Sequence, residues 1–305
     1  MPIYIQSRGK KQDQDYLWLL IKSDKYYPEN PNFLMQPIAN SKLKPIDLIE
    51  SQKQSIILVA DGDSYYLLVT GLTSEKRTDF AGRSIRNSVL WIYQNSDRDK
   101  VRSLLIRALK GKLEREIDKT INAGGKYGFE VDRDLLKLSN SVLNVENNRN
   151  TDSSCKIGSN CEILKQEIAL ELQTSPLPDR NGLLVLVTSI KSASVLKEAA
   201  VWRGLSNRIE NEEFEVYSSR VNLQKKTIFL GIAIATILLI AIALSTIEFT
   251  TPHKPDPEIT PIPSTTQNNS PTTLKAELNP SVNPIEVKEI SCLISSHIFP
   301  EEYGI

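Results

Sequence analysis

The hydrophobic positions of this chain fall into short apolar runs separated by polar turns. Two runs, residues 55–60 and 65–70, flank Asp61 and Gly62. Asp-Gly between two apolar runs is a strong hairpin signal, so both runs are expected to be strands. The same reasoning from short apolar runs of strand length predicts further strands at residues 2–8, 16–21, 89–93 and 183–188.

Longer apolar repeats with a helical period predict helices between these strands. Apolar residues recur every four positions from Val101 onward, which predicts one helix with Ser96 as its N-cap and Gly124-Gly125 as its C-cap. Further helices are expected over residues 161–174 and from Ser192 through an apolar pattern that reaches Ile209. Because strand, turn and helix follow one another, the fold class expected is an α/β domain whose mixed sheet has about five or six strands.

The longest apolar stretch runs over residues 227–247 and contains no charged residue. A helix needs roughly 20 apolar residues to cross the hydrocarbon core of a bilayer. A helix buried in a soluble domain rarely stays apolar on every face over such a length. We therefore expect one transmembrane helix, which makes the lipid bilayer the first expected partner.

The residues that flank this stretch predict its orientation. Arg220, Lys225 and Lys226 precede it, whereas Glu248 follows it with only Lys254 nearby. Lysine and arginine close to a span favour the cytoplasmic side. We therefore expect a single-pass protein of the cell membrane with a cytoplasmic N-terminus and an extracytoplasmic C-terminus.

Small residues within the predicted span bear on its oligomeric state. Gly231 and Ala235 are four positions apart, as are Ala241 and Ser245. This spacing lets two helices approach closely, which would give a homodimer through the transmembrane helix. The same spacing is common by chance in alanine-rich spans, so ordinary lipid-facing positions remain the alternative.

The composition along the chain predicts its division into segments. We expect an α/β domain over residues 1–143 and a linker rich in Asn, Ser and Asp over residues 144–160. A helix-strand-helix segment over residues 161–220 would complete or extend that domain. The predicted transmembrane helix at 227–247 is followed by a tail, residues 248–305, which is rich in Pro and Thr and expected to be disordered.

The formal charges of the chain cancel, with 37 Lys and Arg against 37 Asp and Glu. They are distributed unevenly, because the tail after residue 247 holds three lysines and eight acidic residues. The part before the tail is therefore mildly basic, which suits a position beside an anionic inner leaflet. So mild an excess does not indicate nucleic-acid binding, and we expect no nucleic-acid partner. No sequence motif identifies a cofactor.

The histidines and cysteines limit the chemistry that is expected. His253 and His297 are the two histidines of the chain, and both follow the predicted span. The predicted cytoplasmic part therefore lacks the residue needed for Ser-His-Asp or Cys-His catalysis and for most zinc sites. Cys155 and Cys161 are expected to be free thiols in the reducing cytoplasm. Cys292 lies alone beyond the span and could pair between chains.

The candidate site is a group of five polar residues expected in a loop between two strands, namely Arg77, Asp79, Arg83, Arg86 and Asn87. Loops on a fixed framework commonly present functional groups, and a guanidinium forms a planar fork that pairs with carboxylate or phosphate. Asp79 could orient one arginine and leave the others for an anion or a partner. The alternative is that Asp79 and Glu75 simply neutralise the arginines.

Two segments carry a resemblance to a known group of proteins. Residues 75–88 and the opening Tyr4-Ile5-Gln6-Ser7-Arg8-Gly9 resemble segments of cyanobacterial single-pass membrane proteins of uncharacterised activity. The resemblance covers the first hundred residues or so. It implies a membrane protein and carries no activity, cofactor or site residue with it.

Three functions are compatible with these patterns, and the sequence favours the first. In the first, the cytoplasmic domain binds a ligand or a protein partner and is not an enzyme. In the second, it is a nucleotide- or phosphoester-handling enzyme that uses carboxylates and arginines without histidine. In the third, the protein is a tether whose C-terminal tail reaches a component of the cell envelope.

Overall fold

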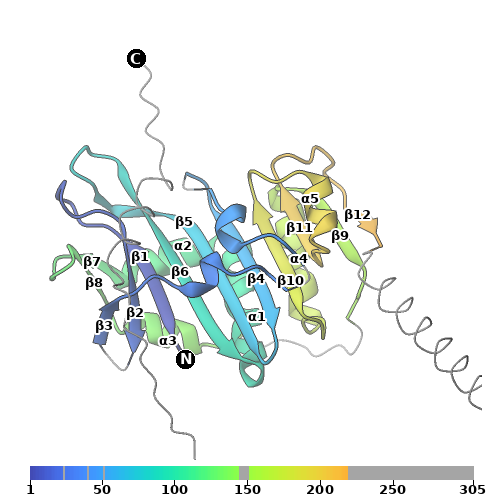
Figure 1. Ribbon diagram of the computed structural model, residues 1–305, viewed down its shortest axis with the longest axis horizontal. Coiled ribbons are helices and arrows are strands. Elements are labelled where there is room, and N and C mark those ends of the chain that lie inside the picture. The colour runs from blue at the N-terminus through green and yellow to red at the C-terminus, as the bar shows by residue number, and fades with distance from the viewer. Residues whose placement is uncertain (23–24, 40, 51, 144–150, 219–305) are drawn as a thin grey trace, which may run out of the picture. The chain divides into compact units, whose positions relative to one another are not determined.

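A mixed β-sheet of ten strands organises the part of the chain that the computed structural model describes, residues 1–22, 25–39, 41–50, 52–143 and 151–218 (Figure 1). Helices pack on the sheet, which confirms the predicted mixed α/β class. The expected number of strands, five or six, was too low. Several strands of this sheet are short or lie in segments that the apolar pattern assigned to a linker or a helix.

The first six strands form an antiparallel half-sheet in the order β4-β5-β6-β1-β2-β3. Their bounds are β1 (Ile3–Ser7), β2 (Leu17–Lys22), β3 (Lys25–Pro28), β4 (Ser55–Asp61), β5 (Ser64–Thr78) and β6 (Ser84–Gln94). The β4–β5 hairpin turns at Gly62, whose φ is +56°, and Asp61 pairs with Ser64. This confirms the hairpin predicted from Asp61-Gly62.

The second half of the sheet contains its parallel strands. Its strands are β9 (Cys155–Ser159), β10 (Gly182–Thr188), β11 (Arg203–Ser206) and β12 (Glu215–Tyr217). In the chain, helix α4 (Glu162–Thr174) lies between β9 and β10, and helix α5 (Ala193–Glu198) lies between β10 and β11. β11 lies parallel to both β9 and β10, and β12 pairs antiparallel with β9 at the edge. Because β10 also pairs antiparallel with β4, the two halves form one sheet.

Both faces of the sheet are covered, which explains why its central strands are continuous apolar runs. One face packs against α1 (Arg98–Leu109), α2 (Lys112–Thr120), α3 (Asp134–Asn140) and α4. The opposite face is covered by α5 and by two short 3₁₀ helices, η1 (Asn32–Met35) and η2 (Pro45–Leu48), in the segment that crosses the sheet in blue in Figure 1. Along β4, Leu58 faces the first layer and its neighbours Ile57 and Val59 face the second.

The single helix expected from Ser96 to Gly124 is two helices. Gly111 has a φ of +66° and separates α1 from α2. The apolar spacing continues across the break because both helices face the same core. Ser96 lies in a 3₁₀ turn, η3 (Asn95–Asp97), and the N-cap of α1 is Asp97. Gly124 and Gly125 lie instead in the turn between β7 (Ile121–Ala123) and β8 (Phe129–Val131).

Two further expectations on the C-terminal half were wrong. Residues 144–160 were expected to be a linker, but β9 occupies Cys155–Ser159 and pairs with β11 and β12. The helix expected to continue from Ser192 to Ile209 ends at Glu198. Trp202 and Leu205 belong to the apolar pattern on which that helix was predicted; both are buried, but Leu205 lies in β11, and Trp202 directly precedes this strand. In both segments, pairing with distant strands determines the structure.

Several expectations fall on residues that the structure does not describe. The predicted transmembrane helix at 227–247, the tail at 248–305, Cys292 and both histidines lie outside the described residues. Within the described part of the chain, no helix is long and apolar enough to cross a membrane. The transmembrane helix, the orientation and the disordered tail therefore stay predictions.

Candidate functional site: a basic cavity at one end of the sheet

A large bulge in β5 shapes the candidate site. Thr73 pairs with Arg86 and Thr78 pairs with Ser84, so that four residues, Ser74–Arg77, lie opposite Ile85 alone. Such bulges bend a strand and redirect its side chains. The five predicted site residues were expected in a loop, but Arg77 belongs to β5, and Arg86 and Asn87 belong to β6. Only Asp79 and Arg83 lie in the turn between these strands.

A carboxylate from α2 holds the bulge in place. Asp118 is buried and accepts hydrogen bonds from the Ser74 hydroxyl at 2.5 Å and the Glu75 backbone N–H at 3.1 Å. The Ser74 oxygen in turn accepts the backbone N–H of Arg77 at 3.0 Å. At the bulge, the backbone N–H groups of Glu75 and Arg77 have no partner in β6, and these bonds give them acceptors. The position of Arg77 is therefore set by helix α2 as well as by the sheet.

The Arg77 guanidinium lies between β1 and β6. Its Nη2 donates to Ser7 Oγ and to Asn87 Oδ1, both at 2.8 Å, and its Nη1 donates to the Arg8 carbonyl at 3.3 Å. Burial lowers the pKa of Arg77 from its ordinary value, although the charge of Asp118 opposes this shift. Arg77 Nε and Asn87 Nδ2 are buried without a hydrogen-bond acceptor among the described residues. Asn87 therefore positions Arg77, and the pair retains unused donors.

The carboxylate of Asp79 closes the β5–β6 turn. Its Oδ1 accepts the backbone N–H groups of Ala81 at 2.9 Å and Arg83 at 3.0 Å. Its Oδ2 lies 2.9 Å from Arg83 Nε and 3.6 Å from Arg8 Nη1. Burial alone would raise the pKa of Asp79, but the hydrogen bonds from Arg83 and Ala81 hold it below its ordinary value. Asp79 thus pairs with Arg83 and lies near Arg8, an arrangement compatible both with orienting these arginines and with neutralising them.

Arg8, which directly follows β1, lies close to two aromatic rings. Its guanidinium carbon lies 5.5 Å from the centroid of the Tyr16 ring and 5.6 Å from that of the Phe80 ring. These are distances at which a cation is attracted to an aromatic face. Phe80 is 52% exposed at the hairpin turn, and this contact gives its exposed ring a structural role. The rings and Asp79 together fix the orientation of Arg8.

These elements line a cavity of about 200 Å³ that is partly open to solvent. Its lining residues belong to or flank the β1–β2, β5–β6 and β7–β8 turns, which lie at the left of Figure 1. Four of its lining residues are basic, and the remaining four carry no charge. The lining consists of Arg8, Lys10, Lys76, Arg77, Thr78, Ile85, Ala123 and Gly128.

Close packing between Gly128 and Gly9 places the β7–β8 turn beside the β1–β2 turn, where it forms one side of the cavity. Gly128 has a φ of +82°, and a Cβ atom placed there would lie 2.7 Å from the Cα of Gly9. A side chain at this position would therefore push the β7–β8 turn away from the turn between β1 and β2. The absence of a Cβ at residue 128 is what allows Arg8 and Ala123 to line one cavity.

The structure brings together some of the predicted site residues and separates others. Arg77 lines the cavity, and Asn87 accepts a hydrogen bond from the Arg77 guanidinium. Asp79 contacts Arg8, which also lines the cavity. The side chain of Arg83 is 70% exposed and pairs with Asp79 outside the cavity lining. Arg86 donates to Thr73 Oγ1 at 2.7 Å and to the Gly71 carbonyl, and it does not line the cavity.

The remaining basic residues of the cavity, Arg8, Lys10 and Lys76, were not predicted. Arg8 is the last residue of a predicted strand and Lys10 follows it after Gly9, which was the one available signal. The sequence does not show that β1 pairs with β6, and this pairing is what places Arg8 beside Arg77. Within the described residues, no group of His, Cys, Asp or Glu could hold a metal ion.

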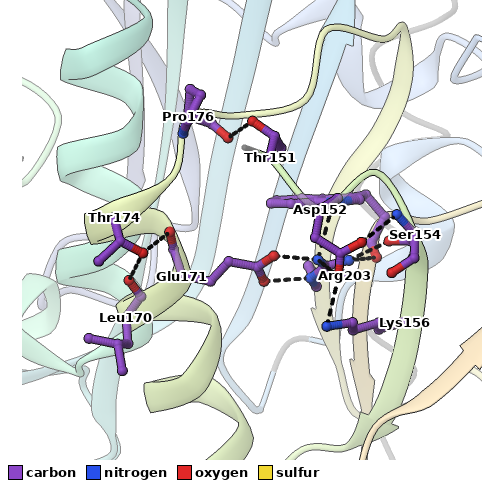
Figure 2. Close-up of polar contacts among 10 residues, drawn as sticks. Thr151, Asp152, Ser154, Lys156, Leu170, Glu171, Thr174, Pro176 and Arg203 are labelled. Carbon is purple, nitrogen blue, oxygen red and sulfur yellow. Dashed lines mark hydrogen bonds and ion pairs between the residues drawn. The ribbon is translucent and has the colours of Figure 1, made fainter. Parts of the chain in front are cut away.

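A second polar cluster surrounds Arg203 and is structural (Figure 2). The Arg203 guanidinium is fully buried and forms a two-bond fork with Glu171 of α4, of which the Nε–Oε2 bond is 2.6 Å. It also donates to the carbonyls of Ser154 and Asp152, and it lies 4.1 Å from the Trp202 ring. Because every nitrogen of this guanidinium has an acceptor, it offers no free donor to a ligand.

The cluster around Arg203 also fixes the start of β9. Asp152 Oδ2 lies 2.9 Å from Lys156 Nζ and 3.5 Å from Arg203 Nη2. Hydrogen bonds from Ser154 and Lys156 hold the pKa of Asp152 well below its ordinary value, despite an opposing effect of burial. The segment before β9 is therefore joined to both α4 and β11 through one arginine.

Comparisons of this chain with protein-family models, with curated proteins and with solved structures gave no match. The resemblance to cyanobacterial single-pass membrane proteins therefore stays a prediction. The geometry of the site is the remaining basis for a function.

Proposed function

We propose that the α/β domain is a non-enzymatic binding domain that holds an anionic ligand, or an acidic group of a protein partner, in the basic cavity. The observation that carries this proposal is the lining itself, in which Arg8, Lys10, Lys76 and Arg77 meet with no acidic residue among them. Cavities lined by one sign of charge concentrate ions of the opposite sign. Arg8 and Arg77 are already held by their neighbours, so an anion would not need to order them.

The composition of the cavity favours binding over catalysis. A general base or nucleophile must lie within hydrogen-bonding reach of the reacting group. The lining residues include no carboxylate, imidazole or thiol, and Thr78 supplies their one hydroxyl. This supports a binding role over the alternative of a histidine-independent enzyme that acts on nucleotides or phosphoesters.

We propose further that a transmembrane helix at residues 227–247 anchors this domain on the cytoplasmic face of the cell membrane. Support comes from the apolar length of that stretch and from Arg220, Lys225 and Lys226 before it. The bilayer is then a permanent partner. A homodimer through the span, or a tether that acts through the tail, would be compatible with binding at the cavity.

The charge-reversed variant Lys10→Glu/Lys76→Glu tests the binding proposal. Both lysines are exposed, and surface changes of this kind usually alter stability by less than about 0.5 kcal/mol. Inorganic phosphate and citrate serve as test anions, and thermal unfolding of the full chain in neutral nanodiscs is the measurement. We expect at least one anion to raise the melting temperature of the natural chain, and the variant to bind it at least about tenfold more weakly.

The matched control is Lys42→Glu/Lys53→Glu, which makes the same charge change at exposed lysines that do not line the cavity. This control is expected to keep the response of the natural chain. Equal losses in both double variants would show a general effect of net charge. A full response in Lys10→Glu/Lys76→Glu would contradict the proposal.

A further inference from the structure

The charge of the cavity exceeds what a single carboxylate would neutralise. Four cationic side chains line it, and two carboxylates act on them: Asp79 lies 3.6 Å from Arg8 Nη1, and the charge of Asp118 acts on Arg77. Asp79 is also paired with Arg83 at 2.9 Å, so its charge is shared. A dianion would therefore match the cavity better than a monoanion.

The size of the cavity limits what can enter it. Pockets that enclose drug-sized ligands typically occupy roughly 300–1,000 Å³. This cavity, at about 200 Å³, is smaller than that and has room for a single tetrahedral anionic group with a short attachment. A complete nucleotide would have to extend beyond it into solvent. The space thus selects for a small charged group and leaves the rest of the ligand unspecified.

The donors of the cavity suit an acceptor with more than two oxygens. Arg8 and Arg77 both line the cavity, and each is only 7% exposed. A hydrogen bond from a charged group is stronger in such a sheltered position than at the open surface. The exposed ammonium groups of Lys10 and Lys76 add three donors each. A phosphoryl group offers three strong acceptor oxygens, whereas a carboxylate offers two.

We propose that the anion held in this cavity is the dianionic phosphoryl group of a phosphate monoester, an inference that rests on the proposed binding function. Arg8 and Arg77 form the rigid wall that contacts the phosphoryl oxygens, and Lys10 and Lys76 close over it from the solvent side. The same group occurs on small soluble phosphates and on the headgroup of a monoester phospholipid. The position of the domain beside a membrane makes both sources accessible.

The test compares anions on the full chain in phosphatidylcholine nanodiscs at about pH 8, where phosphate is mainly a dianion. Trp18, Trp91 and Trp202 are the three tryptophans of the chain, and all lie buried in the described domain, so intrinsic fluorescence reports its unfolding. We expect inorganic phosphate to raise the melting temperature at concentrations at least about tenfold below those needed for acetate at equal ionic strength. Lys10→Gln/Lys76→Gln should reduce the phosphate response, whereas Lys42→Gln/Lys53→Gln should keep it.

A second arm identifies the source of the phosphoryl group. Nanodiscs that contain phosphatidic acid present a phosphate monoester, whereas phosphatidylglycerol presents a diester. A raised melting temperature in phosphatidic acid discs alone, with no further effect of added phosphate, supports the proposal with the lipid as the source. Equal melting temperatures in all discs, with phosphate still effective, support it with a soluble source.

Two outcomes would overturn the inference, and they differ in what else they overturn. If acetate and phosphate act at the same concentrations, and both effects are lost in Lys10→Gln/Lys76→Gln, the phosphoryl assignment is wrong and the anion-binding function stands. If phosphate stabilises that variant as strongly as the natural chain, both the assignment and the proposed function are wrong.

Discussion

Replacing Glu171 by alanine is expected to lower the free energy of unfolding by about 3–5 kcal/mol, the range typical of breaking a buried ion pair from one side. Glu171 provides both oxygens of the fork that holds the fully buried Arg203. Without it, the guanidinium keeps only the carbonyl oxygens near it and the more distant Asp152 carboxylate. Denaturant unfolding followed by tryptophan fluorescence measures the change, since Trp202 lies directly against this guanidinium.

The control for Glu171→Ala is Glu167→Ala on the exposed side of the same helix. It removes the same charge from α4 and is expected to change the unfolding free energy by less than about 0.5 kcal/mol. If the two substitutions cost the same, Arg203 does not depend on Glu171, and the structural role assigned to this cluster is wrong.

Replacing Gly71 by alanine is expected to cost about 3 kcal/mol, because a left-handed backbone penalty and a steric clash add together. Gly71 has a φ of +72° within the irregular part of β5. A Cβ atom there would lie 2.3 Å from the carbonyl oxygen of Lys53, which is backbone and cannot move aside as a side chain can. Thermal unfolding of the full chain measures this loss.

Gly62→Ala separates the two contributions. Gly62 also has a left-handed backbone, with a φ of +56°, but no atom lies within 4 Å of the position that its Cβ would take. This variant should therefore cost only the backbone penalty, about 1–2 kcal/mol. If both variants lose the same free energy of unfolding, the backbone at Lys53 moves aside at little cost and the steric clash at residue 71 contributes nothing.

The sequence predicted the elements whose signal is local. The turn at Gly62, the strand β4 and the helix α4 were expected close to where they lie, whereas β5 extends to Thr78, well beyond the expected residues 65–70. β9 and β11 were missed because each is short and is stabilised by pairing with distant strands. The break at Gly111 was not predicted, because α1 and α2 bury their apolar residues in one core and the helical spacing of these residues continues across the break.

The candidate site shows the same limit at the level of single residues. Arg77 and Asp79 were identified because several charged residues stand close together in the sequence. Arg8, which contacts both of them, directly follows a different strand, and Asp118, which holds the bulge before Arg77, belongs to helix α2. The bulge that directs Arg77 inward left no signal in the apolar pattern. A local cluster of arginines thus indicated the region of the site without indicating which side chains line the cavity.

The most direct test of anion binding in this cavity is the protection of its lysines from acylation. The full chain is treated with a water-soluble succinimidyl ester, with or without inorganic phosphate or citrate, and mass spectrometry follows each lysine. The binding account predicts that a bound anion slows the modification of Lys10 and Lys76 several-fold, while the exposed Lys42 and Lys53 react at unchanged rates. If neither anion changes the modification rate of Lys10 or Lys76, the binding account is contradicted.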